Sequence, residues 1–328
     1  MYKLTAVIAA AAMSLAMLAC GSDDKGSGGA DAAASSGSKT YTIGVANFTL
    51  GAAYFIGMSK AVQEEASTVG NVKVRVTDAG GDAAKLTTDV QNLISQKVDG
   101  IVISGGPLEA APAVLNAAKQ ANIPVVMVDR KLKGGDYASW IGPDNEAIGK
   151  QDGEYIANRL NGKGTVALIR GGPADNTIGL GRTNGVLGVL KSSPGIKTIT
   201  APDFAEWGTD GGVKVAENLL TKYGDLNAIF CENDSMCLGA QKAVKDAGRA
   251  DRIFFAAVDG QKEALKQILD GTNYGVTGLN NSDKIGRMGF HRIVDILGGK
   301  QVQKDTVVPS PQITHDNAKQ YYDPNSLF

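Results

Sequence analysis

The chain has 328 residues, with 33 basic and 34 acidic side chains and a formal net charge of −1. This balance leaves no electrostatic footprint for a nucleic acid, so we expect no nucleic-acid partner. The length allows two domains, and because only 6% of the residues are aromatic, each aromatic side chain near a strand end is a candidate site residue.

The first residues have the composition of a secretory signal, which we place at residues 1–20. An apolar run over residues 4–19 is too short to span a membrane comfortably, and Cys20 follows it. Ala-Cys at this point resembles a bacterial lipoprotein cleavage site, in which Cys20 is lipidated; an ordinary cleaved signal is the alternative. Residues 21–39 are mostly Gly, Ser, Ala and Asp, which predicts a flexible tether because so little apolar surface can be buried.

From residue 40 onward, apolar β-branched runs alternate with helical patterns. The predicted strands cover residues 41–46, 72–77, 100–103, 124–128, 137–141, 165–169, 198–201, 228–231 and 253–258. The predicted helices cover residues 54–69, 84–96, 108–121, 146–160, 181–190, 211–223, 235–247 and 262–269. Continuous apolar strands separated by helices imply right-handed βαβ units and buried parallel sheets. Because these strands are too many for one sheet, the pattern predicts an α/β fold with two doubly wound parallel-sheet lobes.

Two strands of this series end alike. Residues 123–130 (IPVVMVDR) are similar to residues 253–260 (IFFAAVDG), and both runs reach an aspartate, Asp129 or Asp259, at the end of an apolar strand. Because ligands of open α/β sheets bind at the carboxyl ends of the strands, the repeated pattern suggests a ligand held between two lobes.

The charged candidates follow from these strand ends. Asp129 and Arg130 together offer carboxylate acceptors and a rigid donor fork to a small polar ligand, with a surface ion pair as the alternative. Asp259 is a similar candidate, with an N-cap for the next helix as the alternative. Arg182, in the first turn of a predicted helix, is a further ligand donor. The glycines around it only superficially resemble a dinucleotide fingerprint, because the last spacing is one residue too long, and we reject nucleotide binding there.

The run Glu232-Asn233-Asp234 lies between a predicted strand and a predicted helix. We expect Asp234 to cap the helix and Asn233 to point its amide into the cleft. Tyr54, Phe55 and Trp207 are aromatic candidates that could stack on a sugar ring or fill a core.

Nothing in the sequence resembles a catalytic set. There is no Gly-x-Ser-x-Gly elbow, no phosphate loop and no His-Glu-x-x-His motif, and the chain has only two histidines, His291 and His315. We therefore expect a protein that is not an enzyme and that has no metal and no cofactor.

Together, the lipoprotein leader, the two-lobe rhythm and the runs IPVVMVDR, FCENDSMCLGA and AVDG resemble the ribose-binding-protein-like, class I sugar-binding proteins of ABC transporters, over about residues 41–320. The resemblance implies the type I periplasmic binding protein fold, with two lobes joined by a three-strand hinge near residues 142–143, 280–281 and 309–311. The first lobe would comprise residues 40–142 plus 281–309, and the second residues 143–280 plus 310–328.

The resemblance also implies a function and a set of ligand contacts. The contacts carried over from the family are Tyr54, Phe55, Asp129, Arg130, Arg182, Trp207, Asn233, Asp259 and Asn280. The family often has Asn-Asn-Pro where this chain has Gly51-Ala52-Ala53, which favours a polyhydroxyl ligand other than ribose. The implied protein is a monomer, lipid-anchored outside the cytoplasm, that closes on a monosaccharide or sugar alcohol and delivers it to a permease. A receptor for a sugar-like signal is the alternative, and the sequence leaves the ligand open.

Two cysteines, Cys231 and Cys237, flank the Glu-Asn-Asp run. Their spacing fits neither a zinc knuckle nor a Cys-x-x-Cys redox pair. If Cys20 is lipidated, an even pair remains in an oxidising compartment, and we expect a Cys231–Cys237 disulfide, with two buried thiols as the alternative.

Overall fold

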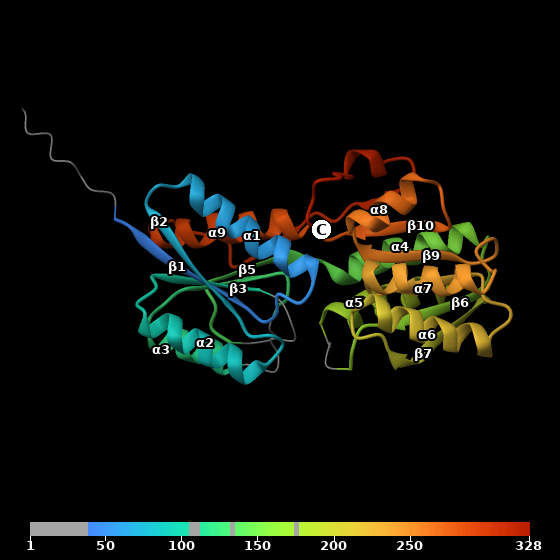
Figure 1. Ribbon diagram of the computed structural model, residues 1–328, viewed down its shortest axis with the longest axis horizontal. Coiled ribbons are helices and arrows are strands. Elements are labelled where there is room, and N and C mark those ends of the chain that lie inside the picture. The colour runs from blue at the N-terminus through green and yellow to red at the C-terminus, as the bar shows by residue number, and fades with distance from the viewer. Residues whose placement is uncertain (1–38, 105–111, 132–134, 174–176) are drawn as a thin grey trace, which may run out of the picture. The chain divides into compact units, whose positions relative to one another are not determined.

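The structure is a computed structural model that describes residues 39–104, 112–131, 135–173 and 177–328 (Figure 1). The predicted signal peptide, the lipidation site Cys20 and nearly all of the predicted tether lie outside these residues, as does the first part of the helix predicted over 108–121. Within the described ranges, no helix combines the length and the apolar character that a membrane span requires.

The first lobe is built on a six-stranded, wholly parallel sheet with the strand order β11-β5-β4-β3-β1-β2. Its strands are β1 (Tyr41–Asn47), β2 (Val72–Asp78), β3 (Gly100–Ser104), β4 (Val125–Val128), β5 (Ser139–Pro143) and β11 (Asp305–Val308). Its helices are α1 (Ala53–Thr68), α2 (Ala83–Ser95), α3 (Ala113–Gln120) and α9 (Ser282–Leu297). In Figure 1, α1 and α9 lie on one face of the sheet, and α2 and α3 lie on the other.

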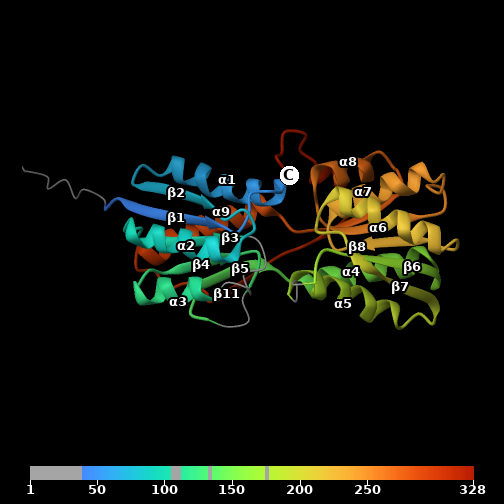
Figure 2. The same ribbon diagram turned by 60° about the horizontal axis from the view of Figure 1, so that its bottom comes forward.

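The second lobe has a sheet with the order β12-β10-β9-β8-β6-β7, in which only β12 runs antiparallel to its neighbour. Its strands are β6 (Lys163–Arg170), β7 (Gly195–Phe204), β8 (Ala228–Cys231), β9 (Phe254–Asp259), β10 (Tyr274–Leu279) and β12 (Gln312–Thr314). Its helices are α4 (Asn145–Arg159), α5 (Ile178–Leu190), α6 (Thr209–Lys222), α7 (Asp234–Asp246), α8 (Lys262–Leu269) and the 3₁₀ helix η2 (Ala318–Gln320). Helices α4 and α5 cover one face of this sheet, and α6, α7 and α8 cover the other (Figure 2).

Each central strand is apolar on both faces because helices cover both faces. In β3, Val102 packs in the core under α1 and α9, whereas its neighbours Ile101 and Ile103 pack in the core under α2 and α3. Alternate side chains of a strand point to opposite faces, so a strand buried on both sides needs a continuous apolar run. This burial on both faces explains the continuous apolar runs from which the sequence predicts parallel strands.

The chain passes between the two sheets three times. It does so between β5 and α4, between β10 and α9, and between β11 and β12. The predicted architecture of two doubly wound α/β lobes joined by three crossings is confirmed. The strands after residue 269, including β10 and the antiparallel β12, were not predicted from the apolar pattern, whereas α9 contains His291, which lies within a helix pattern of the sequence.

Helix α5 begins at Ile178, three residues before the predicted start. Glycines on both helices allow α5 to pack closely against α4. A Cβ on Gly185 of α5 would lie 2.3 Å from the carbonyl oxygen of Glu146, and a Cβ on Gly149 of α4 would lie 2.1 Å from that of Arg182. The glycine-rich sequence that resembled a nucleotide fingerprint therefore marks the contact of two helices.

Candidate ligand-binding site

The site begins at the carboxyl ends of two corresponding strands. Asp129 directly follows β4, and Asp259 is the last residue of β9; both are buried. Both also have positive φ angles, 66° for Asp129 and 125° for Asp259. Such backbone conformations cost about 1–3 kcal/mol each and are concentrated at functional sites. The repeated sequence pattern thus predicted two structurally similar strand ends.

In the first lobe, hydrogen bonds converge on Asp129. The Tyr54 hydroxyl donates to Asp129 Oδ1 at 2.8 Å, and Asn280 Nδ2 donates to the same oxygen at 3.1 Å. The Trp140 indole donates to the Asp129 carbonyl at 3.2 Å. Burial, and then the nearby charge of Asp129, raises the pKa of Tyr54 well above its usual value, so its phenol remains a donor.

Asn280 connects the two strand ends. It lies in the crossing between β10 and α9, and its backbone N–H donates to the Asp259 carbonyl at 3.0 Å while its side-chain amide donates to Asp129. The side chain is buried, and its Oδ1 accepts no hydrogen bond from any described residue. Buried polar atoms are almost always paired, so this acceptor is suited to a donor that a ligand brings.

In the second lobe, Arg182 is held against Asp259. Its NH2 lies 2.9 Å from Asp259 Oδ1, and its side chain is 2% exposed. Its NH1 donates to the Glu232 carbonyl at 2.5 Å, and its Nε donates to Asn145 Oδ1 at 2.9 Å. Because these three N–H groups are directed to protein acceptors, Arg182 is a fixed part of the wall that orients Asp259.

Asp259 is poised to exchange a proton near neutral pH. Burial raises the pKa of its carboxyl to about 7, while the Arg182 guanidinium opposes this shift and the charges of Asp234 and Asp129 add to it. The carboxyl can therefore serve as an acceptor when ionised or as a donor when protonated.

Asn233 caps α7, and the prediction that Asp234 is the cap is wrong. The Asn233 Oδ1 accepts from the Met236 N–H at 2.9 Å, and its Nδ2 donates to the Trp207 carbonyl at 3.1 Å. Asn233 thus holds the Trp207 backbone, which has a positive φ of 61°.

Asp234 is instead the first residue of α7, and it is completely buried. Its Oδ2 accepts from the N–H groups of Gly260 and Gln261 and from the Thr277 hydroxyl, and its Oδ1 accepts from the Tyr274 hydroxyl. Burial raises the pKa of Asp234 to about 6, and these hydrogen bonds limit the increase. The residue joins α7 to the strands β9 and β10.

The aromatic candidates take two different positions. Phe55 is half-buried and packs edge-on against Tyr54, with ring centroids 5.3 Å apart, at the start of α1. Trp207 lies in the loop between β7 and α6, and its indole covers Gly171 so closely that a Cβ there would lie 2.0 Å from the ring. Arg130 is buried and donates from NH1 to the Thr177 hydroxyl of the second lobe at 3.1 Å.

Glu232 is the residue that the sequence analysis missed. It is buried, its Oε2 accepts from the Gly171 N–H at 2.7 Å, and its Oε1 accepts from the Thr183 hydroxyl at 2.6 Å. With its carbonyl bonded to Arg182, it joins the Trp207 surface to the Arg182–Asp259 pair. Its position directly after β8 was the available signal, but only Asn233 and Asp234 of that run received roles.

A disulfide holds this run in place. Cys231 and Cys237 are buried and bonded, with Sγ atoms 2.20 Å apart and Cα atoms 5.4 Å apart. The bond joins the last residue of β8 to the first turn of α7.

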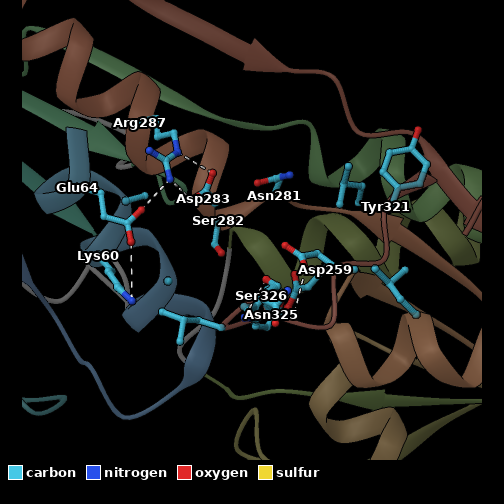
Figure 3. A pocket seen from close by; sticks show the side chains of 18 residues that line it. Lys60, Glu64, Asp259, Asn281, Ser282, Asp283, Arg287, Tyr321, Asn325 and Ser326 are labelled. Atoms are coloured by element: carbon cyan, nitrogen blue, oxygen red, sulfur yellow. Dashed lines mark hydrogen bonds and ion pairs between the residues drawn. The ribbon is translucent and has the colours of Figure 1, made fainter. Parts of the chain in front are cut away.

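Cavities adjoin both strand ends. Asp129 lines one of about 920 Å³, together with Trp140 of the first lobe and Thr177 of the second. Asp259 lines another of about 450 Å³ between α1, α9 and the segment 321–328 (Figure 3). These volumes are in the range of small-molecule sites. Among the described residues, no group of three or more His, Cys, Asp or Glu side chains could hold a metal ion.

Comparison with known proteins places this geometry in a family. A model described as periplasmic binding protein domain matches residues 43–301. A ribose import binding protein of Bacillus subtilis (strain 168) is 32% identical over 271 residues, 83% of this chain and 86% of that protein. A xylitol-binding protein of Mycolicibacterium smegmatis is 30% identical over 316 residues, 96% of this chain and 86% of that protein.

A solved structure supports the same assignment. An ABC transporter solute binding protein from Mycobacterium smegmatis with bound glycerol matches with a TM-score of 0.82 and 27% identity, over 88% of this chain and 98% of that one. The expected type I fold and the resemblance drawn from the sequence motifs are confirmed. Because the family model spans most of the chain and the matched relatives are binding proteins rather than enzymes, the chain belongs to the periplasmic binding protein family.

Proposed function

We propose that this protein captures a monosaccharide or sugar alcohol between its two lobes and delivers it to the permease of an ABC transporter. The main support is the chain of buried polar groups Tyr54–Asp129–Asn280–Asp259–Arg182, which joins the two strand ends through one crossing residue. Ligand hydroxyls can donate to the carboxylates and to Asn280 Oδ1, and such charge-assisted hydrogen bonds are the strong ones. The ribose, xylitol and glycerol named for the similar proteins are polyhydroxyl compounds.

The aromatic residues suit the other surface of such a ligand. Phe55 and Trp207 are both half-buried and present ring area on which the C–H face of a sugar can pack. Several charge-assisted hydrogen bonds plus this packing are sufficient for micromolar binding, which corresponds to about −8 kcal/mol. We propose Tyr54, Phe55, Asp129, Arg130, Arg182, Trp207, Asn233, Asp259 and Asn280 as the residues that form or support the binding surface.

A thermal-shift screen followed by calorimetry tests the ligand class. The panel is D-ribose, xylitol, D-allose, myo-inositol and glycerol. A ligand present at one hundred times its Kd stabilises the folded state by about 2.7 kcal/mol, which raises Tm measurably. Asp259→Asn should weaken the binding of the responding compound, whereas Asp316→Asn, at an exposed position, should not. Unchanged Tm with every compound would refute the proposed ligand class.

We also propose a lipid anchor at Cys20, a signal over residues 1–20, a tether over residues 21–39 and a monomeric, extracytoplasmic binding unit. The lobes would be residues 40–142 plus 281–309 and residues 143–280 plus 310–328, which the membership of β11 and β12 in separate sheets supports. Cys20→Ala should move the chain from the membrane fraction to the soluble fraction. Loss of sugar uptake in cells without this protein supports delivery to a permease, and unchanged uptake would contradict it in favour of a signalling receptor.

A further inference from the structure

The segment 321–328 lies beyond the residues that the family model matches and contacts both lobes. In the second lobe, Lys262 Nζ of α8 donates to the Ser326 carbonyl at 2.6 Å. In the first lobe, the Phe328 ring packs edge-on against the Tyr54 ring of α1, with centroids 5.1 Å apart and planes at 83°. The segment therefore connects α8 to the aromatic pair of the candidate site.

Its contact with α1 is specific. Tyr54 and Gly57 lie one turn apart on the same face of the helix, and a Cβ on Gly57 would lie 3.7 Å from the Phe328 Cβ. Tyr54 thus has two edge-on ring neighbours, Phe55 on its own helix and Phe328 from the segment, while its hydroxyl is bonded to Asp129. Phe328 is therefore a ring neighbour of Tyr54 that comes from outside α1.

The segment begins with Tyr321 and Tyr322, which are half-buried and pack against the core of the second lobe, and most of the residues after them are exposed. Asp323, Pro324, Asn325 and Leu327 are exposed, and the segment lines the cavity of about 450 Å³ whose other walls include α1, α9 and Asp259 (Figure 3). Ser326 and Phe328 thus make the contacts of the more exposed stretch that follows Tyr322. This is the arrangement of a strap that is attached to both lobes.

We propose that Phe328 is a positioning residue for Tyr54, and that residues 321–328 form a strap that links the second lobe to the ligand-contacting start of α1. Its effect on ligand binding rests on the proposed function; its effect on Tyr54 does not. Because the strap contacts both lobes, it stabilises the arrangement in which α8 and α1 are joined, and losing it should hasten ligand release.

The first experiment uses no ligand. Hydrogen exchange at the start of α1, residues 53–58, is compared in the unmodified chain, Phe328→Ala, Phe328→Tyr and the matched control Leu327→Ala. An edge-on aromatic contact corresponds to about a twofold to tenfold change in an equilibrium constant. We expect Phe328→Ala to accelerate this exchange by about that factor and Phe328→Tyr to retain the exchange rate of the unmodified chain. Leu327→Ala, at a residue that is 48% exposed, should leave the exchange unchanged. Equal exchange in Phe328→Ala and Leu327→Ala would overturn the proposal.

The second experiment measures stopped-flow binding of xylitol and D-ribose. We expect Phe328→Ala to raise the dissociation rate of the ligand by the same factor and to leave its association rate nearly unchanged. Without ligand, the Tm of Phe328→Ala should equal the Tm of Leu327→Ala. Lys262→Met, which removes the hydrogen bond to Ser326 but leaves the packing of Tyr321 and Tyr322, should have a smaller effect in the same direction. A Phe328→Ala variant with lowered Tm but an unchanged dissociation rate would show a merely structural contact and refute the strap. If no sugar of the panel binds, the proposed function fails, while the exchange measurement still decides the role of Phe328.

Discussion

Replacing Arg182 by Met should cause one of the largest losses of stability in the site. The change removes the counterion of Asp259, which lies 2.9 Å away with a side chain only 10% exposed. Breaking a buried ion pair by removing one partner costs about 3–5 kcal/mol, because an uncompensated charge stays in the interior. The Glu232 carbonyl and Asn145 Oδ1 also lose their donor, so we expect a loss near the upper end of this range.

The loss should depend on pH in a defined direction. Burial already raises the pKa of Asp259 to about 7, and without the Arg182 guanidinium this pKa rises further. A carboxyl with a raised pKa in the folded state keeps its proton where the unfolded chain has released it, so stability falls as pH rises towards that pKa. Arg182→Met should therefore cost more at pH 8 than at pH 5, where a protonated Asp259 needs no counterion.

Urea unfolding at pH 5 and at pH 8, monitored by tryptophan fluorescence, measures this loss of unfolding free energy. The set comprises Arg182→Met, Asp259→Asn and the double variant, and we expect the double variant to lose less than the sum of the single losses. Arg287→Met is the matched control, because Arg287 also pairs with carboxylates but is 35% exposed, and its loss should stay below about 1 kcal/mol. A loss for Arg182→Met equal to that of the control, or equal at both pH values, would refute the reasoning.

Three further variants test other parts of the second lobe and the site. Asp152 is fully buried on α4, and burial raises its pKa well above the usual value. A carboxyl that keeps its proton in the folded state lowers the free energy of unfolding by up to about 1.4 kcal/mol per pH unit as the pH rises. Asp152→Asn should therefore flatten the decline in the urea-unfolding free energy between pH 5 and pH 8. Tyr54→Phe removes the 2.8 Å hydrogen bond to Asp129 but keeps the ring contacts, and should lower the free energy of unfolding by about 1.5–3 kcal/mol. A loss under about 0.5 kcal/mol, the least expected for a hydrogen bond, would show that this hydrogen bond does not stabilise the fold. Cys231→Ala with Cys237→Ala opens a loop of six-residue separation and should cost about 2 kcal/mol in the chain-entropy model, and a reductant should then have no further effect on Tm.

The sequence predicts the central strands and the two strand-end aspartates well, for a physical reason. Parallel strands covered by helices on both faces need unbroken apolar runs, which are visible without any tertiary information. The residue after such a run lies at the sheet edge where ligands bind, so Asp129 and Asp259 were identified by position alone. The antiparallel β12 is only three residues long, and its pairing with β10 is a long-range contact that no local pattern carries.

The prediction that Asp234 caps α7 was wrong because Asn233 and Asp234 are both good N-caps, and Asn233 takes that position. What separates them is tertiary: Asp234 finds four donors on β10 and in the turn after β9, whereas Asn233 faces the Trp207 carbonyl. Glu232 was overlooked for a similar reason. Its partners are distant in sequence, and a lone glutamate after a strand gives no local indication of them.

Under the proposed function, the position of Asn280 would couple lobe movement to ligand contact. Its backbone N–H is bonded to the Asp259 carbonyl, its side chain is bonded to the Asp129 carboxylate, and it lies in a crossing between the lobes. Both aspartates have backbone conformations that only their surroundings maintain, because a positive φ is unfavourable for a residue with a side chain. A change of backbone angles at this crossing therefore acts directly on both acceptors, and a ligand that binds both acceptors constrains the crossing in return.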